Sequence, residues 1–485
     1  MTITAAHPEP TEDGSVRVGA SGPTIGIALP RHAIGAEGSD ALEWRSRTTM
    51  DTDEVETEHV AGALRAVVQH DVAESSWRVR ASLDNSSDDP ISVSQVLLAV
   101  DPGDGQAWVW AAGAAGLVVL VTRAGDLWGF SLRRGTLARE CGDAVWLEAG
   151  TTLAPGRRTT LELVGRRCQG WDEVASMLPA WLPRLAVRGG EPVDLALPDA
   201  GVVAPGCSIV EGPEGTEIRG SGLQQVGVHG AFGEVHLELA FAPALTEAVD
   251  AAARQVARLV REVPGAVLQL DGTGPDDRAR GLDRTARRLV LLQSARSHEA
   301  ADIVRGWLLD GVTDLLQTGG TCGPFTLAAL AGEVQRRDDP QALQTLMDAL
   351  PSAEAEPGTV LALTRVWAVL WGLGQDPEPV RQALAWASSR PAGTRLEGIE
   401  RALVAGNRDG VMELLAVLGA GLPGAPMPLP EIWQEAYAVA LASLVADEDP
   451  AGPRLVQAAE MVARRLTARG PNDPDVLAWL LLGER

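Results

Sequence analysis

Glu431 is the acidic residue whose neighbours best suit a chemical role. It lies in the stretch PMPLPEIWQEAY, residues 426–437, between Pro430 and Trp433 at the predicted start of a helix. A carboxylate held at the mouth of a helix can act as a general acid or base. The same position suits a structural role, because Pro430 fits a first helical turn and an anion there stabilises the helix dipole by about 0.3–1 kcal/mol. From the residues alone, both interpretations stay open.

The absence of lysine removes several kinds of chemistry. The 41 basic residues of the 485-residue chain are all arginine. Without lysine there can be no Schiff-base nucleophile, no anchor for pyridoxal phosphate and no Walker-type phosphate site. We therefore expect none of these reaction classes, and we expect no cofactor.

The charge of the chain limits its partners. The formal net charge is −24 and the isoelectric point is about 4.7. Nucleic acids and anionic membranes bind basic surfaces, so neither is expected as a partner.

The N-terminal residues lack the basic and apolar regions of a signal peptide, and no apolar run approaches the length of a membrane helix. These features predict a cytoplasmic protein.

No metal site is expected. The four cysteines are scattered without a CxxC pair, which disfavours a structural zinc site. Glu234, His236 and Glu238 alternate along one predicted strand, but the apolar residues between them indicate an ordinary amphipathic strand.

The first half of the chain predicts β-structure. Short β-rich runs such as residues 59–70, 75–84 and 116–123 recur about every ten residues and are separated by turn-forming residues. We assign residues 1–180 to an antiparallel β-sandwich. Residues 181–241 are expected to continue it or to form a small second β module.

Residues 242–485 predict an all-α domain. About twelve helical segments follow one another with short loops rich in Gly, Pro and Asp. Some, such as residues 359–374, are apolar on every side, while others are amphipathic. This mixture predicts an inner set of buried helices surrounded by an outer set that faces water.

This order of elements resembles the glucoamylase-like carbohydrate-active enzymes, in which a β-supersandwich precedes an (α/α)6 barrel. The resemblance covers nearly the whole chain, and LPEIW, residues 429–433, is similar to the Leu-Pro-Glu element that carries the catalytic base of that family. It implies an (α/α)6-like toroid and a site at its mouth, with Glu431 as the base. The Trp-Glu-Glu-type segment that carries the family's general acid has no counterpart here.

The resemblance implies a carbohydrate-active protein, specifically an inverting glycoside hydrolase acting on an oligosaccharide. Such hydrolysis needs a protonated carboxyl group and a carboxylate base. Asp310 and Asp314, in WLLDGVTDLL, are candidates for the acid, because apolar neighbours raise the pKa of a carboxyl group. The alternative is a non-catalytic carbohydrate-binding or protein-interaction scaffold with the same architecture.

Tryptophan is the second indication of a sugar ligand. The chain has 14 Trp but only 4 Phe and 1 Tyr. Indole rings can stack on the apolar faces of sugars, although most buried tryptophans serve only the core. We select as candidate substrate-binding residues Trp433, Trp307, Trp367 and Trp371.

Overall fold

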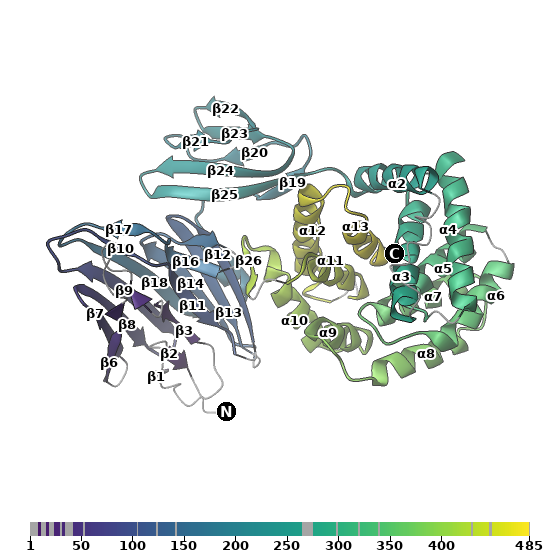
Figure 1. Ribbon diagram of the computed structural model, residues 1–485, viewed down its shortest axis with the longest axis horizontal. Coiled ribbons are helices and arrows are strands. Elements are labelled where there is room, and N and C mark those ends of the chain that lie inside the picture. Colours follow the sequence, from purple (N-terminus) through teal and green to yellow (C-terminus); the bar gives the residue numbers. More distant parts are fainter. Residues whose placement is uncertain are drawn as a thin grey trace.

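The computed structural model describes residues 8–10, 16–18, 24–29, 32–33, 42–51, 54–103, 105–122, 125–140, 143–263, 275–296, 299–318, 321–337, 340–427, 430–445 and 449–484. Within them the chain forms an N-terminal β-sandwich, a second group of strands and a helical domain (Figure 1). This confirms the predicted fold class. No helix in the described ranges is both long and apolar enough to cross a membrane.

The larger sheet of the sandwich has nine antiparallel strands, in the spatial order β26-β12-β13-β14-β18-β9-β8-β7-β6. Their bounds are β6 (Arg45–Met50), β7 (Glu54–Ala61), β8 (Leu64–Val72), β9 (Ser76–Asn85), β12 (Gln106–Ala112), β13 (Ala115–Val121), β14 (Leu127–Arg134), β18 (Arg158–Cys168) and β26 (Ala425–Met427).

The predicted run 59–70 proves to be parts of two strands. A turn at Gly62, whose φ is +59°, separates β7 from β8, and the two strands pair as a hairpin. The apolar alternation continues on both sides of this turn, so the pattern alone did not reveal it.

A smaller sheet and two short ribbons complete the sandwich. The sheet has the order β1-β2-β3-β11-β16-β15, and the ribbons pair β10 with β17 and β4 with β5. These strands are β1 (Pro8–Pro10), β2 (Val16–Val18), β3 (Thr24–Ala28), β4 (His32–Ala33), β5 (Leu42–Glu43), β10 (Ile91–Val93), β11 (Val96–Asp101), β15 (Ala138–Glu140), β16 (Asp143–Leu147) and β17 (Thr151–Leu153).

Helix α1 (Trp171–Ala175) leads from the sandwich to a second group of strands. One sheet has the order β19-β25-β24-β21 and another the order β20-β23-β22. The strands are β19 (Ala186–Arg188), β20 (Val193–Leu195), β21 (Gly201–Val203), β22 (Ser208–Gly212), β23 (Gly215–Arg219), β24 (Gly222–Gly230) and β25 (Gly233–Ala242). These strands have their own sheets and lie beside the sandwich in Figure 1.

The helical domain alternates along the chain between outer and inner helices. The helices are α2 (Leu245–Glu262), α3 (Pro275–Ser294), α4 (Glu299–Gln317), α5 (Pro324–Arg337), α6 (Pro340–Ala349), α7 (Thr359–Gly372), α8 (Glu378–Ser389), α9 (Arg395–Val404), α10 (Arg408–Val417), α11 (Ile432–Leu441), α12 (Gly452–Arg469) and α13 (Pro474–Leu482).

The inner helices close into a ring. Helices α3, α5, α7, α9, α11 and α13 each contact the next, and α13 returns to contact α3. The remaining helices pack outside them, for example α4 on α3, α8 on α7 and α12 on α11 (Figure 1). Each outer helix brings the chain back to the side of the ring on which the preceding inner helix began. The inner helices therefore all run in the same direction. The predicted toroid is therefore present and closed.

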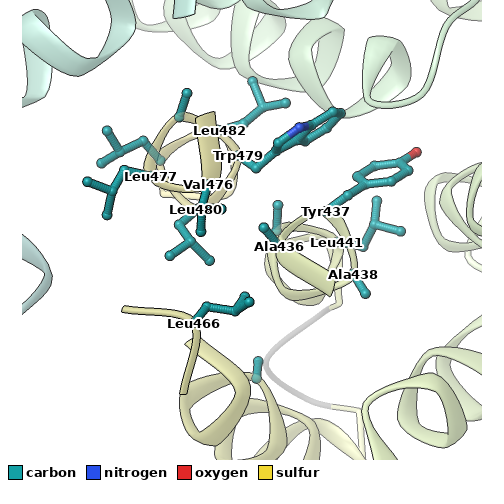
Figure 2. Close-up of a cluster of buried hydrophobic side chains, with 14 of the residues drawn as sticks. Ala436, Tyr437, Ala438, Leu441, Leu466, Val476, Leu477, Trp479, Leu480 and Leu482 are labelled. Atoms are coloured by element: carbon teal, nitrogen blue, oxygen red, sulfur yellow. The ribbon is translucent and has the colours of Figure 1, made fainter. Parts of the chain in front are cut away.

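Burial explains which helices are inner. Helix α7 is buried along most of its length, whereas outer α8 buries little beyond Val380 and Ala387. Figure 2 shows the same principle where α11 and α13 meet. Tyr437 and Trp479 lie side by side there and are 0% and 3% exposed. Burying such large side chains contributes roughly 1.5–3 kcal/mol each.

A short segment of the helical domain joins the β-sandwich. Strand β26 pairs antiparallel with β12 and so extends the nine-stranded sheet. The indole N–H of Trp108 on β12 donates a 2.7 Å hydrogen bond to the carbonyl of Pro423. Gly424 makes the close approach possible, because its φ is +97° and a Cβ there would lie 2.3 Å from the Val109 carbonyl oxygen. This segment leads directly into Glu431 and α11.

Candidate functional site

The N-terminal ends of the inner helices face the same side of the ring, and we call this side the ring mouth. It is the side on which α5, α7, α11 and α13 begin, at Pro324, Thr359, Ile432 and Pro474. Helix N-termini carry free backbone N–H groups and a partial positive charge, so polar and acidic ligands are favoured there. The side chains at this end therefore define the candidate site.

Aromatic rings fill the centre of the ring below the mouth. Trp479 of α13 meets Phe325 of α5 edge to face, with ring centroids 4.8 Å apart, and Tyr437 of α11 is also 4.8 Å away. The guanidinium of Arg287 on α3 lies over Phe325, 4.4 Å from its centroid. Both ring pairs add stability beyond burial, and the cation adds a further attraction. The floor of the site is thus formed mainly by aromatic rings.

Glu400 of α9 is a carboxyl group enclosed in this floor. It is 1% exposed, accepts a 2.7 Å hydrogen bond from the Tyr437 hydroxyl and accepts another of 2.7 Å from the Leu361 N–H. Burial raises its pKa to about 7, although the hydrogen bonds from Tyr437, Leu361 and Gly358 oppose the rise. A group so enclosed cannot touch a substrate, so its role is to connect α7, α9 and α11.

Glu356 is the perturbed carboxyl group that is open to solvent at the mouth. It lies in the loop before α7, where the Glu354 N–H donates to the Cys322 carbonyl and so ties this loop to the start of α5. The Glu356 N–H donates 3.1 Å to the Thr359 hydroxyl. These bonds hold the Glu356 backbone in place at the ring mouth.

The surroundings of Glu356 favour its protonated form. Burial raises its pKa to about 7, the nearby carboxylates of Glu354 and Asp283 raise it further, and Arg287 opposes them. The residue as a whole remains exposed to solvent. A carboxyl group that is protonated near neutral pH and accessible can deliver a proton.

Asp283 and Asp475 complete the acidic side of the mouth around Arg287. Arg287 Nε lies 2.8 Å from Asp283 Oδ2, and its Nη1 lies 3.7 Å from Asp475 Oδ1. Burial raises the pKa of Asp283, and Arg287 counters this. The mouth therefore combines a carboxyl group of raised pKa, two aspartates and a guanidinium.

The structure places Glu431 and Trp433 together at the same mouth. Glu431 is the N-cap of α11 in a capping box with Gln434, and the Trp433 indole N–H donates to its Oε2. Trp433 stacks on Trp479 with centroids 5.7 Å apart. Glu431 is thus a helix-start acid, as predicted, but it is the N-cap and not a residue of the first turn, and Pro430 lies before the helix, which begins at Ile432. The suggested role of Glu431 as a catalytic base stays a prediction.

Asp310, Asp314 and Trp307 lie elsewhere. All three are exposed on outer helix α4, which packs against α2 and α3. Trp307 is 45% exposed. The structure does not bring these residues together with Glu431, because outer helices turn such faces to solvent.

Trp367 and Trp371 belong to the opposite end of the ring. Both lie in the second half of α7, which begins at the mouth and ends at Gly372. Trp371 is 70% exposed, and Arg381 of α8 covers Trp367 with its guanidinium 5.6 Å from the ring centroid. Of the four selected tryptophans, Trp433 alone lies at the mouth.

A cavity of about 330 Å³ continues from Trp433 toward the β-sandwich. Its apolar lining includes Trp108 and Met427, and its polar lining includes Arg395 and Glu435. Arg395 is held by a 2.7 Å hydrogen bond to Gln106. An apolar wall with a few fixed polar groups is typical of small-ligand pockets. Among the described residues no group of His, Cys, Asp and Glu has the arrangement of a metal site.

Sequence reasoning did not select Glu356, Asp283 or Arg287. The segment AEAEPG, residues 353–358, contains two acids just before a helix, which is a local signal of the same kind that drew attention to Glu431. What the sequence does not reveal is that α3, α5 and α7 meet there, because that depends on closure of the ring.

Comparison with known proteins gives a fold neighbour but no sequence relative. No protein-family model matches this chain, and no curated protein matches it. A solved structure named as a polysaccharide lyase matches with a TM-score of 0.54 and 12% sequence identity, covering 96% of this chain and 82% of that chain. At this identity the likeness concerns the fold, and nearly the whole of this chain shares it.

Proposed function

We propose that this chain is a carbohydrate-active enzyme that hydrolyses a glycosidic bond at the ring mouth, with Glu356 as the proton donor. The observation that carries the proposal is the exposed Glu356 at the ring mouth, in a loop tied to the start of α5 and in surroundings that raise the pKa of its carboxyl group. The fold neighbour, which is named as a polysaccharide lyase, supports a carbohydrate substrate.

The proposed reaction uses two carboxyl groups. Glu356 donates its proton to the oxygen of the leaving sugar, while an ionised carboxylate removes a proton from the water that attacks the anomeric carbon. Glu431 is our candidate for that base, since it lies at the start of α11 on the same side of the ring. This arrangement would be that of an inverting glycoside hydrolase on an oligosaccharide.

The substrate would lie against Trp433. Its indole is braced by Trp479 and by the bond to Glu431, so its orientation is fixed before a ligand arrives. The cavity beside it offers Arg395 and Glu435 to sugar hydroxyl groups. Preorganised contacts of this kind reduce the entropy cost of binding.

Elimination is the second candidate function, because the fold neighbour is named as a lyase and Arg287 lies at the mouth. A guanidinium can neutralise the carboxylate of a uronic acid while a base removes the adjacent proton. Tyr437 is a possible base by residue type, but it is 0% exposed and bonded to Glu400. Hydrolysis is therefore the function that we favour.

The test measures cleavage of a panel of neutral and uronate-containing oligosaccharides by the wild type and by Glu356→Gln. Glu378→Gln, on the surface of outer helix α8, is the matched control. We expect new reducing ends from the wild type and from the control, and a loss of about 10²-fold or more in Glu356→Gln. Thermal unfolding verifies that both variants fold.

Each other outcome rejects a defined part of the proposal. Wild-type rates in Glu356→Gln reject Glu356 as the proton donor. Unsaturated products, detected by their ultraviolet absorbance, indicate elimination. Binding by the wild type without cleavage supports the non-catalytic alternative. The absence of both binding and cleavage would contradict a carbohydrate function.

A further inference from the structure

A second cavity, of about 450 Å³, lies where the three parts of the protein meet. Its walls come from β12 and the start of β15 in the sandwich, from β24 and β25, and from α12. Figure 1 shows α12 near the centre of the molecule. We call it the junction cavity. It shares Glu435 and Arg465 with the cavity beside Trp433, and its charged and polar lining further includes Arg139, Arg469, Gln225, His236 and Glu238.

Arg139 enters this cavity without a matching anion. Its Nη2 is buried and has no hydrogen-bond partner among the described residues, and its Nη1 reaches the Val109 carbonyl only at 3.5 Å. Burial and the neighbouring Arg465 lower its pKa, while Glu435 and Glu238 raise it. Burying a cation costs free energy, and the nearby carboxylates offset this cost only in part, since the pKa of Arg139 stays below its ordinary value.

The two carboxylates near the cavity already have partners. Glu435 accepts a 2.9 Å hydrogen bond from Arg465, and Glu238 accepts one of 3.2 Å from Gln225. Arg465 is held further by a 2.7 Å bond to the Gly424 carbonyl. Arg469 has no ion pair within the described part of the chain. Three guanidinium groups thus face two engaged carboxylates, in a protein whose net charge is −24.

We propose that the junction cavity binds a small molecule through an oxyanion, a carboxylate or a phosphate, held by Arg139 with Arg469. The planar guanidinium offers paired N–H donors that match both groups. Gln225 and His236 supply further polar contacts for the rest of the ligand. Because its walls belong to all three parts, a ligand here also links their relative positions.

The test is isothermal titration of the full-length protein with three probes: inorganic phosphate, glucuronate and neutral glucose. We expect either anion, or both, to bind with a dissociation constant below about 1 mM, and glucose to give no heat. Phosphate alone indicates a phosphate ligand, and glucuronate alone indicates a sugar carboxylate. Arg139→Gln is expected to weaken binding about tenfold or more.

Two further variants keep the test decisive. Arg469 is exposed, so Arg469→Gln should fold normally, and we expect it too to weaken binding. Arg381→Gln, on distant α8, should bind as the wild type does. No binding of either anion at about 10 mM, or unchanged binding in both Arg139→Gln and Arg469→Gln, would overturn the proposal. Arg139 and Arg469 line the junction cavity but not the cavity beside Trp433, so a loss of anion binding in their variants is independent of whether the protein cleaves a sugar.

Discussion

The Tyr437 hydroxyl donates a 2.7 Å hydrogen bond to Glu400 in the interior of the ring of helices. Both residues are almost completely buried, and Glu400 also accepts from the Leu361 N–H. Together, these two hydrogen bonds connect the inner helices α7, α9 and α11 immediately below the mouth. Glu400 therefore helps to hold the first turn of α7, which directly follows the loop that carries Glu356.

The first prediction concerns the pH dependence of stability. Burial raises the pKa of Glu400 from 4.5 to about 7, so the folded protein binds this proton more tightly than the unfolded chain does. The free energy of unfolding should fall as the pH rises from about 4.5 to about 7, by roughly 3 kcal/mol for this group. In Glu400→Gln that part of the decline should be absent.

Urea denaturation at about pH 5 and about pH 8 measures this difference. Glu378→Gln, an exposed acid on α8, should keep the wild-type decline. If the free energy of unfolding of Glu400→Gln falls as steeply with rising pH as that of the wild type, Glu400 does not titrate as described.

The second prediction concerns the segment that joins the ring to the sandwich. Gly424 and Gly421 both have positive φ, at +97° and +80°, so alanine is strained at either position. Only at Gly424 would the new Cβ lie 2.3 Å from the Val109 carbonyl oxygen, while at Gly421 the nearest atom is 3.8 Å away.

Gly424→Ala should therefore lower the free energy of unfolding by about 2 kcal/mol or more beyond the loss in Gly421→Ala. Denaturant titration of both variants measures the difference. Because both glycines have positive φ, this difference isolates the contact between residue 424 and β12. Equal losses would mean that this contact adds nothing.

The third prediction separates the tryptophans at the two ends of the ring. Trp433→Ala removes the aromatic face at the mouth, and we expect it to weaken oligosaccharide binding about tenfold, or ~1.4 kcal/mol. Trp371→Ala removes a more exposed indole at the far end of α7 and should leave binding unchanged. Isothermal titration of both variants with the same ligand makes the comparison. The reverse order of effects would place the ligand at the opposite end.

The general architecture could be predicted because it depends on local patterns. Alternating β runs and the contrast between all-apolar and amphipathic helices are encoded within single segments, as in residues 359–374. Strand β26 could not be predicted in this way. It is three residues long in a stretch rich in Pro and Gly, and its partner β12 lies about 300 residues earlier.

The site, too, could be predicted only where its residues are close together in sequence. Glu431 and Trp433 are neighbours in sequence, so their shared place at a helix start could be predicted. Glu356 is positioned by the loops that precede the neighbouring helices α5 and α7, which pair at Cys322 and Ala353. Its pKa depends on burial, on Glu354 in its own loop and on Asp283 from α3. Asp310 and Asp314 have apolar neighbours in sequence, but the helix turns both carboxylates to solvent.

The pH dependence of cleavage tests the central claim most directly. If Glu356 is the proton donor, kcat/KM on the cleaved oligosaccharide should fall as the pH rises through about 7. Removing the negative charge of its neighbour in Glu354→Gln should lower the pKa of Glu356 and move this fall to lower pH. An alkaline limb that stays in place in Glu354→Gln and persists at the wild-type rate in Glu356→Gln would contradict the account.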